Sequence, residues 1–162
     1  MPSNIRQITS QDNPSVADLI RTVMPEFGAG GKGFAIHDPE VDDMFAAYST
    51  PRSVYFVCEE NGRIIGGGGV APLQGAVETI CELKKMYFMQ AGRGRGLGQK
   101  LLGECMKAAR GFEFEVCYLE TFNTMHSAMK LYERNGFHRI PGPLGNTGHF
   151  ACDIFYALKF DS

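Results

Sequence analysis

A run rich in glycine and arginine, Arg93 to Gly98, is the part of this sequence best suited to hold an anion. Glycine lets the backbone turn sharply and approach a ligand without a Cβ in the way. An apolar run precedes it, and apolar residues at spacings of three and four follow it, so it joins a predicted strand to a predicted helix. Because the first N–H groups of a helix lack partners and carry partial positive charge, this turn predicts a seat for a phosphate or pyrophosphate. The side chains of Arg93 and Arg95 add cationic donors.

Two well-known phosphate-binding fingerprints do not fit this run. The P-loop pattern G-x-x-x-x-G-K-[ST] is absent from the sequence. The dinucleotide pattern G-x-G-x-x-G fails because its sixth position is Leu97 or Gln99, depending on the glycine from which the count starts. Gly66 to Ala71 satisfies G-x-G-x-x-A, but Pro72 follows and no helix begins there, which argues against a dinucleotide site. Close packing or a bulge in a strand is the favoured interpretation of these glycines.

The spacing that does fit Arg93 to Gly98 is [Q/R]-x-x-G-x-[G/A]. In this spacing, and in the stretch Leu131-Tyr132-Glu133-Arg134-Asn135-Gly136-Phe137, the sequence resembles the GNAT superfamily of N-acyltransferases. The resemblance implies acetyl-CoA as co-substrate, its pyrophosphate on the glycine run and its pantetheine arm along the main chain of the preceding strand. The residues implied to contact it are Met86, Tyr87, Phe88, Arg93, Gly94, Arg95, Gly96, Leu97, Gly98 and Asn123.

Two side chains are implied to move protons. Glu82 occupies the position of the carboxylate base in family members that have one on this strand, and burial on an apolar strand would raise its pKa. The alternative for Glu82 is a salt bridge to Lys84 or Lys85; strand alternation puts it on the face of Lys84 and Met86 unless a bulge intervenes. Tyr132 is implied to protonate the leaving thiolate, and its alternative role is packing against the sheet. The resemblance also implies that the Met86 N–H donates to the developing oxyanion.

The acceptor side is implied by loop positions. Glu26, in the loop after the first helix, and Asn146 and His149, in the loop before the last strand, are the candidate substrate-binding residues, each with a solvated loop residue as the alternative. The sequence departs from the family where Met125 stands in place of a common Asn, so Asn123 or its neighbour Thr124 is the candidate replacement.

The elements that must position these residues follow from periodicity and from turn signals. Asn13-Pro14 starts a helix, Pro39 opens a short one, and Asn61-Gly62 is a hairpin turn. Strands are predicted at 4–9, 53–59, 63–71, 78–88, 114–120, 137–140 and 150–158, and helices at 13–25, 39–48, 97–109 and 125–134. The order predicts an α/β protein with a mixed sheet and helices on both faces. It resembles the GNAT fold, which implies a mostly antiparallel sheet of about six or seven strands.

Composition narrows the class of protein. The 162 residues predict one domain, 1–162, and 44% hydrophobic residues supply its core. The net charge of −2 gives no case for nucleic acid, and no apolar run approaches a membrane span. We expect no signal peptide, because the N-terminus is polar within its first ten residues. Five scattered cysteines without a C-x-x-C pair indicate free thiols in a reducing compartment, so we expect a cytoplasmic location. The four histidines show no metal-ligand spacing, so we expect no metal.

Together these features predict an N-acetyltransferase that moves an acetyl group from acetyl-CoA to a primary amine of a small molecule or peptide. The amine would attack directly in a ternary complex, since no cysteine lies in the glycine run or beside a matching histidine. Two alternatives stay open: a non-catalytic sensor that binds acyl-CoA or a metabolite, and a thioester hydrolase. The sequence leaves the acceptor, the acyl length and the choice between monomer and homodimer open.

Overall fold

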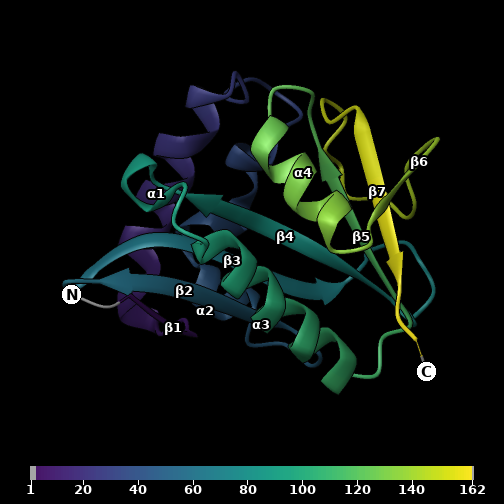
Figure 1. Cartoon of the computed structure of the whole chain (residues 1–162), viewed down its shortest axis with the longest axis horizontal. Coiled ribbons are helices and arrows are strands. Elements are labelled where there is room, and N and C mark those ends of the chain that lie inside the picture. Colours follow the sequence, from purple (N-terminus) through teal and green to yellow (C-terminus); the bar gives the residue numbers. More distant parts are fainter. Residues whose placement is uncertain (1–2, 162) are drawn as a thin grey trace.

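A seven-stranded sheet runs through the centre of the computed structural model, which describes residues 3–161 (Figure 1). Its strands are β1 (Asn4–Gln7), β2 (Val54–Glu60), β3 (Arg63–Pro72), β4 (Ile80–Phe88), β5 (Val116–Thr121), β6 (His138–Ile140) and β7 (Ile154–Lys159). They lie in the order β1-β2-β3-β4-β5-β7-β6. All neighbouring pairs are antiparallel except β4 and β5, which are parallel. The predicted mixed, mostly antiparallel sheet is confirmed.

Helices cover both faces of this sheet. They are α1 (Asn13–Glu26), α2 (Met44–Ala47), α3 (Leu97–Gly111) and α4 (His126–Arg134). Helices α1 and α2 pack on one face and α3 and α4 on the other (Figure 1). The helix predicted from Pro39 is instead a 3-10 turn, Pro39–Asp42, followed by the single turn of α2. No helix within residues 3–161 combines the length and the apolar character that crossing a membrane requires.

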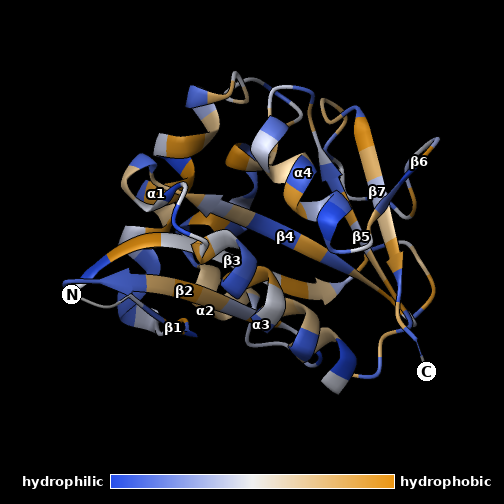
Figure 2. Cartoon of the chain, in the orientation of Figure 1, coloured by the Kyte–Doolittle hydropathy of each residue, from blue (hydrophilic) through white to orange (hydrophobic). Residues whose placement is uncertain are grey.

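Each face of the sheet has its own hydrophobic core. On the α3 and α4 side, Leu102 and Cys105 of α3 pack with Tyr132 of α4 over the strands. On the α1 side, Ile20 and Met24 pack against the sheet. Figure 2 shows hydrophobic residues along the central strands, with polar residues on the outer turns of α3. Four of the five cysteines are buried, Cys152 is half-buried, and all five are free thiols, as predicted.

The four consecutive glycines of β3 leave room for aromatic side chains of the neighbouring strands. A Cβ added at Gly67 would lie 2.6 Å from the Tyr55 hydroxyl, and one at Gly66 would collide with the ring of Phe88. A Cβ at Gly69 would collide with the main-chain oxygen of Val54. Close packing, which the sequence favoured here over a dinucleotide site, therefore accounts for these glycines.

A bulge interrupts β4 opposite the glycines. Gly67 pairs with Tyr87 while Gly69 pairs with Lys84, so β4 carries one residue more than β3 between these pairs. Lys85 lies in the bulge with a φ of 50°, a left-handed conformation that is unusual for a residue with a side chain. Its carbonyl oxygen accepts a hydrogen bond of 2.8 Å from the Tyr55 hydroxyl.

This bulge reverses the side-chain alternation along β4. Met86 packs in the core below α3 and α4, whereas Glu82 lies with Met24 and Tyr87 on the α1 side. The exception that the sequence analysis allowed therefore applies: Glu82 and Met86 lie on opposite faces, because the extra residue turns every later side chain over.

The parallel pairing of β4 with β5 stops early. Only Ile80, Cys81 and Glu82 pair with β5, at Val116 to Tyr118, although β4 continues for six more residues to Phe88. Beyond Glu82 the two strands diverge (Figure 1). The last part of β4 is thus paired with β3 on one edge and free of β5 on the other.

Gly69→Ala tests the packing of the glycine strand. The new methyl group cannot fit against the main chain of β2, so we expect a loss of about 1 to 3 kcal/mol in the free energy of unfolding. Gly103→Ala is the matched control, because a Cβ there meets nothing within 4 Å inside α3. That change should raise stability by about 0.5 to 1 kcal/mol. Denaturant unfolding measures both; equal effects of the two changes would contradict this account.

Candidate active site

The glycine run forms a turn whose main-chain donors are free. Gly94 and Gly96 have φ values of 73° and 76°, which favour glycine, and Gly96 caps the start of α3. Gly92 N–H donates to Met89 O and Arg93 N–H to Gln90 O, but within residues 3–161 no such bond is made by the N–H groups of 94–98. Several donors therefore converge at the N-terminus of α3, where the helix dipole also favours an anion.

Arg93 lies beside this turn with one donor unused. Its Nε donates to Phe88 O at 3.0 Å, and its Nη1 donates to Glu26 Oε2 at 3.1 Å. Its Nη2 is buried and has no hydrogen-bond partner in the part of the chain that the structure describes. The guanidinium lies 5.1 Å from the centre of the Phe27 ring. A buried, unpaired cationic donor at this place is unfavourable without a ligand, which points to an anion here.

Arg95 points elsewhere. Both of its Nη atoms contact the Glu60 carboxylate at the end of β2, and Nη1 also donates to Ala91 O at 3.2 Å. The Arg95 side chain thus links the turn to the β2–β3 hairpin. It does not line the cavity beside β4. The arginine of this run that faces the cavity is therefore Arg93.

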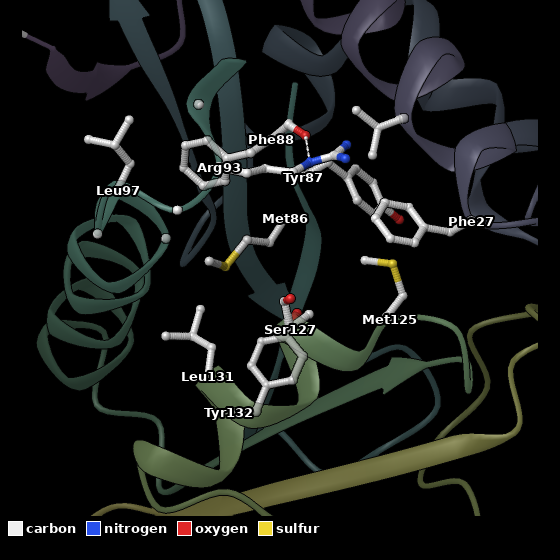
Figure 3. Close-up of a pocket in the computed structure, with 16 residues that line it drawn as sticks. Phe27, Met86, Tyr87, Phe88, Arg93, Leu97, Met125, Ser127, Leu131 and Tyr132 are labelled. Carbon is white, nitrogen blue, oxygen red and sulfur yellow. Dashed lines mark hydrogen bonds between the residues drawn. The ribbon is translucent and has the colours of Figure 1, made fainter. Parts of the chain in front are cut away.

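A cavity of about 170 Å³ extends from the turn along the free edge of β4 (Figure 3). Its walls are the turn itself, the end of β4 and helix α4. Met86 and Tyr132 point into it, and Phe27 and Met125 close the side toward α1 (Figure 3). The cavity combines a mostly apolar slot with bare peptide donors at one end.

Tyr132 is buried between the cavity and the core of α4. Its ring lies 5.8 Å from that of Phe137 and 6.1 Å from that of Tyr156, between centroids. Burial raises the pKa of the Tyr132 phenol above its ordinary value, so the hydroxyl stays protonated at neutral pH. The packing role and the proton-donating role expected for this residue are compatible with the same position.

Glu82 is buried on the opposite face, with 6% of its surface exposed. Burial raises the pKa of its carboxyl group to about 7, although the charge of Lys84 opposes this. The salt bridge that the sequence allowed is absent within residues 3–161: Lys85 donates to Asp38 and Glu40 at 2.7 and 2.9 Å instead. A carboxyl group with a pKa near 7 is suited to accept a proton at neutral pH.

His149 is held between two carboxylates beside Glu82. Its Nε2 lies 2.8 Å from Asp38 Oδ2 and its Nδ1 lies 3.6 Å from Glu120 Oε1. Burial lowers the pKa of His149, but its hydrogen bonds to these carboxylates outweigh burial and raise it to about 9. Ligand atoms of Glu82, Glu120 and His149 come within 4.8 Å of one another, a grouping that the histidine spacing does not predict. Because both ring nitrogens face acids, this imidazole serves as a cation in an ion-pair network.

Two further spaces lie between the cavity and the acceptor-side loops. Tyr87 lines both the 170 Å³ cavity and a space of about 40 Å³ that also contains Glu82. Glu82 in turn lines a polar pocket of about 240 Å³ together with Lys84 and His149. Glu82 therefore lies between the slot beside β4 and a pocket that a second molecule can enter.

The comparisons with known proteins identify one family. The model of the acetyltransferase (GNAT) family matches residues 16–137. The chain belongs to the GNAT family. This assignment makes the protein an acetyltransferase and confirms the resemblance drawn from the glycine run and from the stretch around Tyr132.

The relatives and solved structures agree with this assignment. The chain is 46% identical over 151 residues to the uncharacterized N-acetyltransferase YjgM of Escherichia coli K12, covering 93% of this chain and 90% of that protein. A GNAT acetyltransferase from Staphylococcus aureus has a TM-score of 0.86 at 21% identity, covering 98% of this chain and 99% of that one. The PaiA N-acetyltransferase of Thermoplasma acidophilum, solved with coenzyme A, has a TM-score of 0.75 at 16% identity over 99% and 100% of the chains.

The cavity beside β4 brings together most of the residues expected at the cofactor. Of the predicted set, the cavity is lined by Met86, Tyr87, Phe88, Arg93, Gly94, Gly96, Leu97 and Gly98, together with Tyr132. Asn123 is exposed and does not line it; Thr124 instead bonds to Phe27 O at 2.6 Å, and Ser127 faces the cavity. Ser127 and Leu131 were missed, although they lie four residues apart and so share one face of α4.

The expected acceptor residues of this GNAT chain do not form one group. His149 lies beside Glu82 as described, but Glu26 is paired with Arg93 near the glycine run. Asn146 shares a surface hollow with His149 and Phe150 but does not line the pocket that contains Glu82. Asp38, Glu40 and Glu120, which complete the network around Glu82, were not singled out from the sequence, because their segments meet only in the folded chain.

Glu82→Gln tests the environment of this carboxyl group. The folded pKa of about 7 lies above the ordinary 4.5, so wild-type stability relative to Glu82→Gln should be highest below pH 4.5 and fall as pH rises through 7. Each pH unit in this window corresponds to about 1.4 kcal/mol, which gives a change of about 3 kcal/mol by pH 8. Unfolding titrations between pH 4 and 8, with exposed Glu78→Gln as control, measure it. A stability difference independent of pH would contradict the burial argument.

Proposed function

We propose that this chain, acting as a single domain over 1–162, transfers an acetyl group from acetyl-CoA to a primary amine of a small molecule or peptide. The observation that carries the proposal is the set of unpaired N–H groups at 94–98, at the mouth of a slot beside the free edge of β4. The free cysteine thiols favour a reducing, cytoplasmic setting for this reaction.

The residues present fit acetyl-CoA. The main-chain donors at 94–98 and the unpaired Nη2 of Arg93 suit a pyrophosphate. The main chain of Met86 to Phe88, unpaired on the β5 side, suits an extended amide-bearing arm that adds to the strand edge. Acetyl-CoA supplies an acetyl group on a thioester, which an amine can attack to form an amide while the carbon–sulfur bond breaks.

The chain's own residues handle the protons. Glu82, with a pKa near 7, takes a proton from the amine at its carboxylate, directly or through water. Tyr132 gives the proton of its hydroxyl to the leaving sulfur from the α4 side of the slot. The Met86 N–H donates to the carbonyl oxygen as negative charge develops on it. Amine deprotonation and sulfur protonation thus occur on opposite faces of β4.

A sensor and a hydrolase are the competing functions, and one assay separates them. The protein is incubated with acetyl-CoA, with and without a panel of amines, and free thiol and acetylated product are followed. Transfer predicts thiol release that depends on the amine and is matched by product mass. Thiol release at the same rate with and without an amine would establish hydrolysis. Binding of acetyl-CoA without thiol release would establish a sensor. Either result would contradict the proposal.

Tyr132→Phe tests the proton donor. The change keeps the ring that packs against Phe137 and Tyr156 but removes the hydroxyl. We expect turnover to fall by about 100-fold, in the range of a lost general acid, with little change in affinity for coenzyme A. Steady-state kinetics and calorimetric titration measure the two quantities. Tyr156→Phe, which removes a hydroxyl bonded to Glu133 away from the slot, is the matched control and should retain turnover.

A further inference from the structure

The pocket on the outer side of Glu82 contains one cation whose head group has only a long ion pair and stays partly exposed. Lys84 lines this pocket, and its Nζ lies 3.5 Å from Glu40 Oε1 and 5.6 Å from the centre of the Tyr48 ring. Within residues 3–161 it has no shorter polar contact. Its side chain is 20% exposed, so the ammonium can reach a ligand.

The other cations of this region are already satisfied. Lys85 is 1% exposed and donates to both Asp38 and Glu40, and His149 lies between Asp38 and Glu120. Neither offers a free donor to a molecule in the pocket. Lys84 is therefore the group best able to bind an anionic part of the acceptor.

The charges around Glu82 are balanced. Asp38, Glu40 and Glu120 contribute three negative charges, and Lys84, Lys85 and protonated His149 contribute three positive charges. A polyamine carries several positive charges, but only the Glu82 carboxylate would be unpaired and able to neutralise one of them. A molecule with one amine and one acid group would find a separate partner for each.

We infer that the acceptor is a small amine that also carries a carboxylate, such as a free α-amino acid, with its amine at Glu82 and its carboxylate at Lys84. This inference rests on the proposed acetyl transfer. It excludes polyamines and the N-termini of peptides, which lack a carboxylate close to the amine.

The spacing along β4 fits such a molecule. Glu82 and Lys84 follow the regular register with Ala71 and Gly69, so both point to the same face before the bulge. Two residues of a strand span about 7 Å. Because both side chains line the same pocket, a small molecule whose amine and acid groups are a few bonds apart can contact both.

The test compares matched acceptors. The twenty common L-amino acids are each paired with the same amino acid in which a primary amide replaces the carboxylate. For each pair, kcat/KM with acetyl-CoA and the binding constant in the presence of coenzyme A are measured for the wild type, Lys84→Met and Lys84→Arg. Lys107→Met, an exposed change on α3, is the control. Taking the ratio within a pair cancels any effect of these changes on Glu82 itself.

For the accepted amino acids, we expect the wild type to prefer the acid over its amide by at least tenfold. Lys84→Met should remove most of that preference, while Lys84→Arg and Lys107→Met should keep it. Equal use of acids and amides, or a preference that survives in Lys84→Met, would overturn the inference and leave acetyl transfer standing. If no amine releases thiol, the proposed function fails, and the binding constants of the same pairs still decide whether Lys84 selects a carboxylate.

Discussion

The early separation of β4 from β5 is the constraint on which the rest of this structure depends. Three residue pairs hold the two parallel strands together, and the remainder of β4 keeps one edge free. The bulge at Lys85 lies on this free edge, three residues beyond the last pair with β5, and the buried ammonium of Lys85 is held by Asp38 and Glu40. The glycines of β3 let the other side of β4 pair tightly without side chains in the way. Main-chain groups at 86–88 are thereby left without β5 partners beside a slot.

The bulge also separates the two halves of the proposed chemistry. Because it reverses alternation, Met86 faces the slot under α3 and α4 while Glu82 faces the ion-pair network on the α1 side. The slot is mostly apolar, which suits a long, flexible arm, and the opposite pocket is polar, which suits a soluble acceptor. A single strand thus presents its main chain to one molecule and its carboxyl group to another. Tyr87, which lines both the slot and the space around Glu82, lies where the two must meet.

Local pattern predicted the order of strands and helices, the turn from Arg93 to Gly98 and the position of Tyr132, because each depends on residues close together in the chain. The helix predicted from Pro39 is a 3-10 turn followed by a single α-helical turn. Tertiary packing, and not helix propensity, determines the conformation of so short an element. Side-chain partners could not be predicted in this way. The pairing of Arg95 with Glu60 and of Arg93 with Glu26 joins segments far apart in the sequence. The bulge at Lys85 is equally invisible, because lysine carries no signal for a positive φ.

The central claim is that free main-chain donors at 94–98, with the free edge of β4, form the seat of the cofactor. Residue-resolved amide hydrogen exchange, with and without saturating coenzyme A, tests it most directly. The account predicts rapid exchange in the free protein for the amides at 94–98 and for those of 86–88 that face the slot. With coenzyme A, these amides should become protected, while the amides of β1 and β2 should change little. Amides at 94–98 that are already protected in the free protein, or that stay unprotected at saturation, would contradict it.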